Sequence, residues 1–467
     1  MNEILKNDLD NFSSILEEIH KNSISFLNDI GEIPTSHTDQ NADFFPLTDG
    51  GVGASGALGL FNKHFRKLMV SSAGPRYWGY VVGGVTPAAL AGDWLTSVFD
   101  QNTQSANGSG DISAIVELQT IRLMIELFGL PDQFNGGFVS GATMSNFTCL
   151  GVARQWAGIQ SGVDVAREGM TGETVVLAAT PHSSVIKSLS MLGFGSNNFI
   201  RIKTDPERER IDIIDLEEKL VKFSGKSVII NCSAGTVNTV DFDDFQAISV
   251  LKEKYGFWMH VDAAFGAFAA CSDKHHHLLK GWENADSITI DCHKWMNVPY
   301  DSAIFLTRKK HQKLQMQTYQ NSNAPYLGDP KVNFSYLNFL PENSRRFRAL
   351  PAWFSLTAYG KEGFKWIVEN SIHCAEMLTN YLESSANFKL CGVVNLNVVC
   401  FALKDYDKTS EFLNILNARG KVFMTPTMLD GHPCMRAAFV NFRTSKEDVD
   451  IAIQEMEAVL ELINITQ

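Results

Sequence analysis

The sequence predicts an α/β protein with a mainly parallel sheet, and two observations support this fold class. Between about residues 173 and 308, short β-branched or apolar runs alternate with helical patterns, which is typical of a parallel sheet covered by helices on both faces. The chain has 467 residues, of which 45% are hydrophobic and 20% charged. It is therefore long and apolar enough for a large core or for two domains.

Six strands are expected in this middle region, and helical patterns separate them near residues 182–193, 214–222 and 243–254. The expected strands are Glu173–Thr180, Phe199–Lys203, Lys226–Cys232, Phe257–Asp262, Ser287–Asp291 and Ser302–Thr307. Because they lie in one continuous stretch, they are expected to form a single sheet.

The two ends of the chain show different patterns. Residues 4–30 predict one or two amphipathic helices, and residues 35–60 predict a connection rich in Gly, Asp and Thr. After the Pro- and Asn-rich residues 321–343, the sequence indicates a smaller C-terminal α/β domain. Its expected elements are long helices over 350–384, strands near 388–403 and a closing helix over 445–463. We therefore predict an N-terminal helical segment (1–60), a large domain (61–345) and a small C-terminal domain (346–467).

Composition and charge argue against several classes of function. Forty Lys and Arg against 52 Asp and Glu give a net charge of −12, and no basic stripe appears, so no nucleic-acid partner is expected. Arg76 and Asp93 interrupt the most apolar stretch, residues 74–95, so no membrane span is expected. The N-terminal residues lack the pattern of a secretory signal, and the eight cysteines include no C-x-x-C pair. A cytoplasmic protein with reduced thiols is predicted.

Two motifs have a simpler explanation than ligand binding. The glycines of residues 51–56 match the dinucleotide fingerprint, but neither a buried strand before them nor an acidic residue at the required distance after them supports it. Cys271 and the histidines at 275–277 are potential zinc ligands, yet three consecutive histidines cannot all face one ion from regular structure. A connector and a solvated segment are predicted instead, and no metal site is expected.

A loop that opens a helix, residues 138–146, has the composition of an anion site. Small residues would leave the backbone N–H groups at the helix start accessible, and the positive end of the helix dipole would attract an anion. The hydroxyl groups of Ser140, Thr143 and Ser145 would add donors. Taken alone, such a loop is more often an ordinary capped helix.

Two strands end in residues that suggest catalysis. Asp262 ends one strand, and Lys294 follows the end of the next, at the sheet edge where α/β folds bind ligands. Burial would lower the pKa of the lysine and make it a nucleophile able to form a Schiff base. Alone, each residue also fits a structural aspartate or a solvated surface lysine. Together with the anion site, they supply the three contacts that pyridoxal 5'-phosphate (PLP) needs: phosphate, ring nitrogen and aldehyde carbon.

These residues resemble the group II PLP-dependent amino-acid decarboxylases, which include aromatic-amino-acid, glutamate and histidine decarboxylases. Seven segments in the family's order carry the resemblance: residues 74–80, 140–146, 181–185, 233–236, 260–264, 291–295 and 344–349. The resemblance implies the aspartate-aminotransferase-like fold (fold type I), with a large mainly parallel sheet domain and a small C-terminal domain. It also implies a homodimer that shares its active sites and whose N-terminal segments pack on the partner chain.

The resemblance assigns roles to matched positions. Lys294 resembles the Schiff-base lysine, Asp262 the partner of the protonated ring nitrogen, and His182 the residue stacked on the ring. Four further residues match cofactor contacts and one matches the neighbour of the lysine; these are Ala142, Thr143, Thr236, Ala264 and His293.

Substrate contacts are expected from Tyr80 and from Arg436, which resembles an arginine near the substrate carboxylate. An ion pair at the surface or between domains is the alternative for Arg436. Val237 and Asp291 depart from the family pattern, since relatives often carry threonine and aromatic-specific relatives carry asparagine at these positions.

The expected activity is decarboxylation of an L-amino acid to the amine and carbon dioxide, with an aromatic amino acid favoured. Residues 80–84 provide a smaller pocket wall than aromatic-specific relatives have, and residues 101–107 are polar. Another polar or acidic amino acid is therefore the alternative substrate. Transamination, oxidative deamination after decarboxylation and a non-catalytic binding role are the alternative activities.

The proton donor of the reaction is expected on a loop. In the family, a tyrosine from the partner subunit protonates the carbanion; Tyr326 resembles it, and Tyr336 is the competitor.

Relatives with phenylalanine at that position form aldehydes with oxygen. Tyr326→Phe is therefore expected to shift the product from amine to aldehyde, measured by chromatography of both products. An unchanged amine yield would rule out this assignment.

Overall fold

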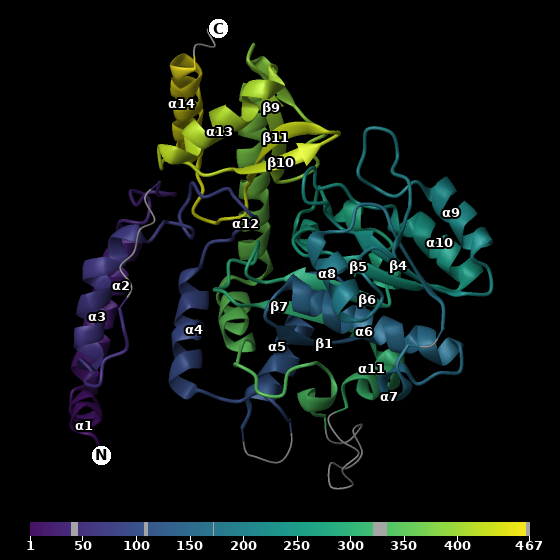
Figure 1. The fold of residues 1–467 in the computed structure, drawn as a ribbon, viewed down its shortest axis with the longest axis horizontal. Coiled ribbons are helices and arrows are strands. Elements are labelled where there is room, and N and C mark those ends of the chain that lie inside the picture. Colours follow the sequence, from purple (N-terminus) through teal and green to yellow (C-terminus); the bar gives the residue numbers. More distant parts are fainter. Residues whose placement is uncertain (39–44, 107–110, 171, 321–333, 464–467) are drawn as a thin grey trace.

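The computed structural model describes residues 1–38, 45–106, 111–170, 172–320 and 334–463 (Figure 1). It contains a seven-stranded and a four-stranded sheet. The long helix α12 (Ala349–Ser384) runs from the larger sheet to the smaller one, which lies at one end of the molecule with the C-terminal helices. Within α12, Gly360 has a φ of 56°, so two helical segments meet there at an angle.

The larger sheet has the strand order β1-β7-β6-β5-β4-β2-β3. Its strands are β1 (Phe134–Val139), β2 (Thr174–Ala178), β3 (Ile200–Arg201), β4 (Ser227–Ser233), β5 (Trp258–Asp262), β6 (Ser287–Asp291) and β7 (Ala303–Arg308). Strand β7 pairs antiparallel with both of its neighbours, and the other pairs are parallel. The six expected strands are confirmed. Strand β1 was not expected, because two central glycines weaken its strand pattern.

Both faces of this sheet are buried. Val176, Ile229 and Trp258 pack with α6 (Ala142–Gln160) and α8 (Ser183–Met191). The alternate residues of the same strands belong to the main core on the other face, which is covered by α5 (Ser113–Leu127), α9 (Ile213–Lys222), α10 (Phe245–Tyr255) and part of α12. Successive strand side chains point to opposite faces, so uninterrupted apolar runs fill both layers.

The N-terminal helices α1 (Glu3–Asp10), α2 (Phe12–Asn28) and α3 (Gly53–His64) lie beyond α4 (Pro87–Phe99) on the outside of the molecule (Figure 1). The first two confirm the predicted amphipathic helices. The expectation of a connection through residue 60 was wrong, because α3 begins at Gly53, where the Ala54 N–H donates to Asp8 Oδ2 at 3.0 Å. None of the residues of α1, α2 or α3 is buried.

The smaller sheet is antiparallel in the order β10-β11-β9-β8. Its strands are β8 (Phe388–Leu390), β9 (Val398–Leu403), β10 (Thr425–Leu429) and β11 (His432–Ala438). Helices α13 (Thr409–Ala418), α14 (Lys446–Leu462) and the end of α12 share its core. The short helices α7 (Val165–Glu168) and α11 (Gln312–Tyr319) complete the α-helices of the described residues. No helix in these parts of the chain is long and apolar enough to cross a membrane.

A buried ion pair fixes the end of β1, from which the chain enters α6. Arg345 Nη2 donates to Glu117 Oε1 at 2.6 Å and to the Phe138 carbonyl at 2.7 Å. The Phe138 N–H donates to the same Glu117 oxygen at 2.8 Å. Both charged side chains are fully buried. Removing one partner of such a pair leaves an uncompensated buried charge.

Glu117→Gln is therefore expected to lower the free energy of unfolding by about 3 kcal/mol, measured by urea denaturation. Asp93→Asn is the matched control, because it breaks the more exposed pair between Asp93 and the adjacent Arg346. That control should cost less than about 1 kcal/mol. Equal losses in the two variants would contradict this role of the Glu117 pair.

Candidate functional site

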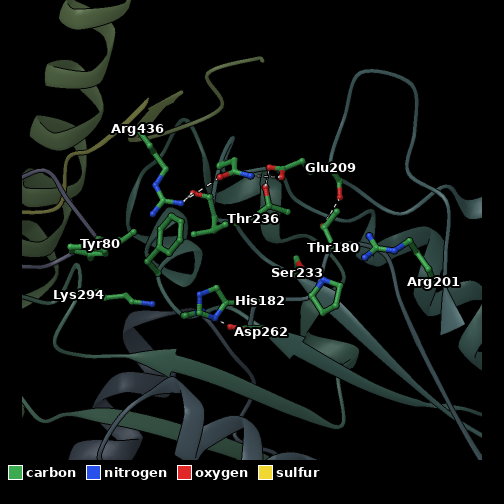
Figure 2. A pocket seen from close by; sticks show the side chains of 17 residues that line it. Tyr80, Thr180, His182, Arg201, Glu209, Ser233, Thr236, Asp262, Lys294 and Arg436 are labelled. Carbon is green, nitrogen blue, oxygen red and sulfur yellow. Dashed lines mark hydrogen bonds between the residues drawn. The ribbon is translucent and has the colours of Figure 1, made fainter. Parts of the chain in front are cut away.

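A cavity of about 320 Å³ opens at the carboxyl ends of β4 and β5. Seven of the predicted site residues line it: Tyr80, His182, Thr236, Asp262, Ala264, Lys294 and Arg436. In Figure 2, the side chains of Lys294, His182 and Arg436 converge on one space above Asp262. Residues more than 350 positions apart in the sequence thus meet at the edge of the sheet predicted for ligand binding.

Lys294 follows β6 and carries a buried ion pair with the end of that strand. Its Nζ lies 2.8 Å from Asp291 Oδ2. The second oxygen of Asp291 is buried without a hydrogen-bond partner among the described residues. Asp291, one of the departures from the family pattern, therefore holds the lysine ammonium.

The glycines at 83 and 84 have a structural explanation. A Cβ atom on Gly83 would lie 1.9 Å from the Lys294 carbonyl oxygen, and one on Gly84 would lie 2.4 Å from Asn441 Oδ1. The backbone of this segment therefore packs directly against the backbone that carries the lysine. From the sequence, the same glycines are expected to shorten a wall of the substrate pocket, and the close approach of the two backbones supplies a different reason for them.

Asp262 ends β5 as a buried carboxylate. Its Oδ2 accepts a hydrogen bond from Asn146 Nδ2 at 3.1 Å, and its Oδ1 accepts one from the Ala264 N–H at 3.2 Å. Both donors are neutral. A buried carboxylate is stabilised by a cationic partner, so Asp262 suits a protonated ring nitrogen.

His182 caps the N-terminus of α8, and its Nδ1 accepts from the Ser184 N–H at 3.2 Å. Burial lowers the pKa of His182, although Asp262 opposes this shift. The imidazole is therefore neutral at pH 7, with its proton on Nε2.

Helix α6 begins at Ala142, as the predicted anion site requires, but it does not supply every expected donor. Ser145 is fully buried, and its hydroxyl is bonded to Thr289 Oγ1 and to the Ile304 carbonyl, each at 2.9 Å. The expectation that Ser145 serves an anion was therefore wrong. Ala142 and Thr143 start the helix but do not line the cavity.

His293, which follows β6, packs against Gly141 at the N-cap of α6 and likewise does not line the cavity. Its Cε1 would be 3.3 Å from a Cβ atom on Gly141, and its ring stacks on Tyr300 with centroids 4.3 Å apart. The Ser302 N–H donates to its Nδ1 at 3.2 Å, and its Nε2 lies 3.6 Å from Asp291 Oδ1. Burial lowers the pKa of this imidazole as well.

Glu209 lines the cavity and was not identified from the sequence. Its carboxylate accepts from the hydroxyls of Thr236 and Thr239 at 2.7 Å each, from the Thr239 N–H at 3.0 Å and from Asn238 Nδ2 at 3.2 Å. The Thr236 hydroxyl therefore faces Glu209. No pattern in the sequence links residue 209 to this loop, because the contact depends on how two loops pack.

Arg436, on β11, is buried against the same loop. Its Nη1 donates to the Val237 carbonyl at 2.9 Å and lies 3.5 Å from Asn238 Oδ1. Burial lowers the pKa of this guanidinium. The alternative of an ion pair does not apply among the described residues, because the acceptors of Arg436 are a carbonyl and an amide.

Of the two candidate proton donors, Tyr326 lies outside the described residues. Tyr336 is fully buried in the core, with its hydroxyl 3.4 Å from the Gly136 carbonyl and its ring centroid 4.3 Å from Arg345 Cζ. The structure thus excludes Tyr336 as a residue of this cavity.

Comparisons with known proteins agree with this geometry. The family model described as the pyridoxal-dependent decarboxylase conserved domain matches residues 63–404. An aromatic-L-amino-acid decarboxylase of Bacillus atrophaeus is 28% identical over 438 residues, which cover 90% of this chain and 88% of that protein.

Two solved structures share the fold. The crystal structure of Oryza sativa TDC with PLP and tryptamine matches with a TM-score of 0.89 at 20% identity, over 97% of this chain and 98% of that chain. Mouse CSAD in its apo form matches with a TM-score of 0.87 at 19% identity, over 97% and 99%. The fold type I architecture expected from the sequence is confirmed. Because the family match spans most of the chain, this protein belongs to the pyridoxal-dependent decarboxylase family.

Proposed function

We propose that this protein binds PLP through Lys294 and decarboxylates an aromatic L-amino acid to its amine and carbon dioxide. One observation supports this most strongly. Lys294, Asp262 and His182 line a single cavity in a chain of the pyridoxal-dependent decarboxylase family. The same three residues argue against a binding protein without catalytic activity, which would not need an amine able to form a Schiff base.

Each side chain around the cofactor would have a separate role. When bound, PLP supplies an electron sink for the pair released as the bond between Cα and the carboxylate breaks. Asp262 would keep a proton on the ring nitrogen, while His182 and Ala264 would contact opposite faces of the ring. Ala142 and Thr143 would hold the phosphate at the start of α6, beside His293.

Which bond to Cα breaks depends on how the substrate is positioned. The substrate carboxylate must stand perpendicular to the ring plane. Arg436 and the neutral His182 are the candidates for holding it there, and Tyr326 for returning a proton to Cα afterwards. Arg436 can present a cation because its own acceptors are uncharged.

An aromatic substrate is supported by two relatives and by part of the cavity wall. The B. atrophaeus relative is an aromatic-L-amino-acid decarboxylase, and the Oryza sativa structure contains tryptamine. Tyr80, Pro181 and Phe265 give this cavity flat apolar surfaces. Tyr80 is 61% exposed on its own chain, so it is accessible to a substrate.

An acidic or polar amino acid is the second candidate. Besides Lys294, two cationic side chains, Arg201 and Arg436, line the cavity, together with the polar side chain of Asn238. Such a wall suits a second anionic group on the substrate.

We also propose a homodimer, with the N-terminal segment 1–60 packed on the partner. Large apolar side chains on this segment are exposed: 64% for Leu5, 63% for Leu9 and 57% for Phe12. Contiguous exposed apolar residues indicate an interaction surface. The cytoplasmic location remains a prediction from the sequence.

A screen of amine and carbon dioxide release tests the reaction and substrate together. The PLP-loaded protein is incubated with all common L-amino acids, ornithine, diaminobutyrate and cysteine sulfinate, with Lys294→Ala as the blank. Equal amounts of amine and carbon dioxide are expected from an aromatic amino acid. Release from an acidic or basic amino acid alone would refute the aromatic assignment, and cofactor binding without carbon dioxide release would refute decarboxylation.

A substitution at Glu209 tests the proposed substrate contact of Arg436. Because Glu209 fixes the loop at 236–239, to which Arg436 donates, Glu209→Ala should loosen that arginine. Loss of a charge-assisted network of this size should raise KM about tenfold with a smaller change in kcat, measured by steady-state kinetics. Glu207→Ala, with the same change of charge at an exposed neighbour, is the control. A fall in kcat at unchanged KM would contradict the link to Arg436.

A further inference from the structure

Asn146, in the second turn of α6, joins the two residues proposed to contact the cofactor ring. It is fully buried, and all its hydrogen-bonding groups have partners. Its Nδ2 donates to Asp262 Oδ2 and to Ser184 Oγ, each at 3.1 Å, and its Oδ1 is 2.9 Å from His260 Nε2. A carboxylate can only accept, so the amide nitrogen must face Asp262 and the amide oxygen must face His260.

This orientation sets the direction of a longer chain of hydrogen bonds. An amide oxygen only accepts, so His260 carries its proton on Nε2. Burial lowers the pKa of His260 to about 4, so at pH 7 the ring is neutral and its Nδ1 is an acceptor. Ser287 Oγ lies 2.9 Å from that Nδ1, and Trp258 Nε1 donates to Ser287 Oγ at 3.0 Å. Each group from Trp258 to Asp262 therefore donates to the next.

The second N–H of Asn146 supports the tautomer of His182 that the Ser184 N–H fixes. Ser184 Oγ accepts from Asn146, so its own hydrogen is available for His182 Nδ1 at 2.8 Å. The Ser184 N–H donates to the same nitrogen. His182 is thereby held in the tautomer with its proton on Nε2.

We propose that Asn146 and His260 are positioning residues that hold the Asp262 carboxylate against the cofactor ring nitrogen. The inference rests on the proposed function. Its physical basis is that donors to a carboxylate favour the charged form, and hydrogen bonds aligned in one direction strengthen one another. Within the described part of the chain the two side-chain and backbone donors to Asp262 are neutral, so the strength of the Asn146 donor matters directly.

The test measures the protonation of the PLP ring nitrogen directly. PLP labelled with 15N at that atom is bound to each protein, and its protonation is measured by solid-state 15N NMR at pH 7.5. His260→Phe removes the donor to Asn146. Asn146→Leu removes the amide that bonds Asp262, Ser184 and His260 and replaces it with a side chain of similar size. His260→Gln should restore the signal, because its amide N–H can donate to Asn146 Oδ1. Asn231→Ala is the matched control, since Asn231 is buried beside His260 in register on β4 but makes no side-chain hydrogen bond among the described residues.

We expect a protonated nitrogen in the wild type, His260→Gln and Asn231→Ala. In His260→Phe and Asn146→Leu, the signal should shift towards neutral pyridine, and the Kd for PLP should rise about tenfold. Folding of each variant is checked by circular dichroism, and one folded variant of the two is enough for the test.

Three results would count against the proposal. An unchanged nitrogen signal in a folded His260→Phe or Asn146→Leu protein would overturn this inference alone. If both variants unfold while Asn231→Ala stays folded, the hydrogen bonds of Asn146 and His260 have a purely structural role. If the wild type takes up no labelled PLP, the proposed function itself fails.

Discussion

The parallel pairing of β4, β5 and β6 is the constraint on which the site depends. In the register of these strands, Ser233 lies opposite Asp262, and Asp262 lies opposite Thr289. The strands therefore end at one edge of the sheet, and the residues that follow them meet there. The carboxylate of Asp262 and the amine of Lys294 line one cavity because their strands are neighbours, although 31 residues of sequence separate them.

Helix α6 connects this edge to the rest of the core. The buried Glu117–Arg345 pair binds the backbone of Phe138 near the end of β1, four residues before α6 begins, and the second turn of α6 carries Asn146. Asn146 thereby links α6 to the carboxylate of Asp262 and, through Ser184, to the imidazole of His182.

The sequence predicted what depends on local pattern and missed what depends on packing. Runs rich in apolar or β-branched residues identified strands β2 to β7, because the central strands of the sheet are buried on both faces. Strand β1 was not predicted because glycines weaken its strand pattern, and α3 was not predicted because its first residues are small. Lys294, Asp262 and Arg436 were found through motifs. The roles of Glu209 and Gly83 could not be found, since each is defined by contact with a distant segment.

The central claim, that Lys294 is the residue that binds PLP covalently, can be tested without knowledge of the substrate. Borohydride reduction of the PLP-loaded protein fixes the cofactor on the amine that holds it, and peptide mass spectrometry then locates the label. The account predicts one pyridoxyl group on the peptide containing Lys294. A label on another lysine, or no label after PLP has bound, would contradict it.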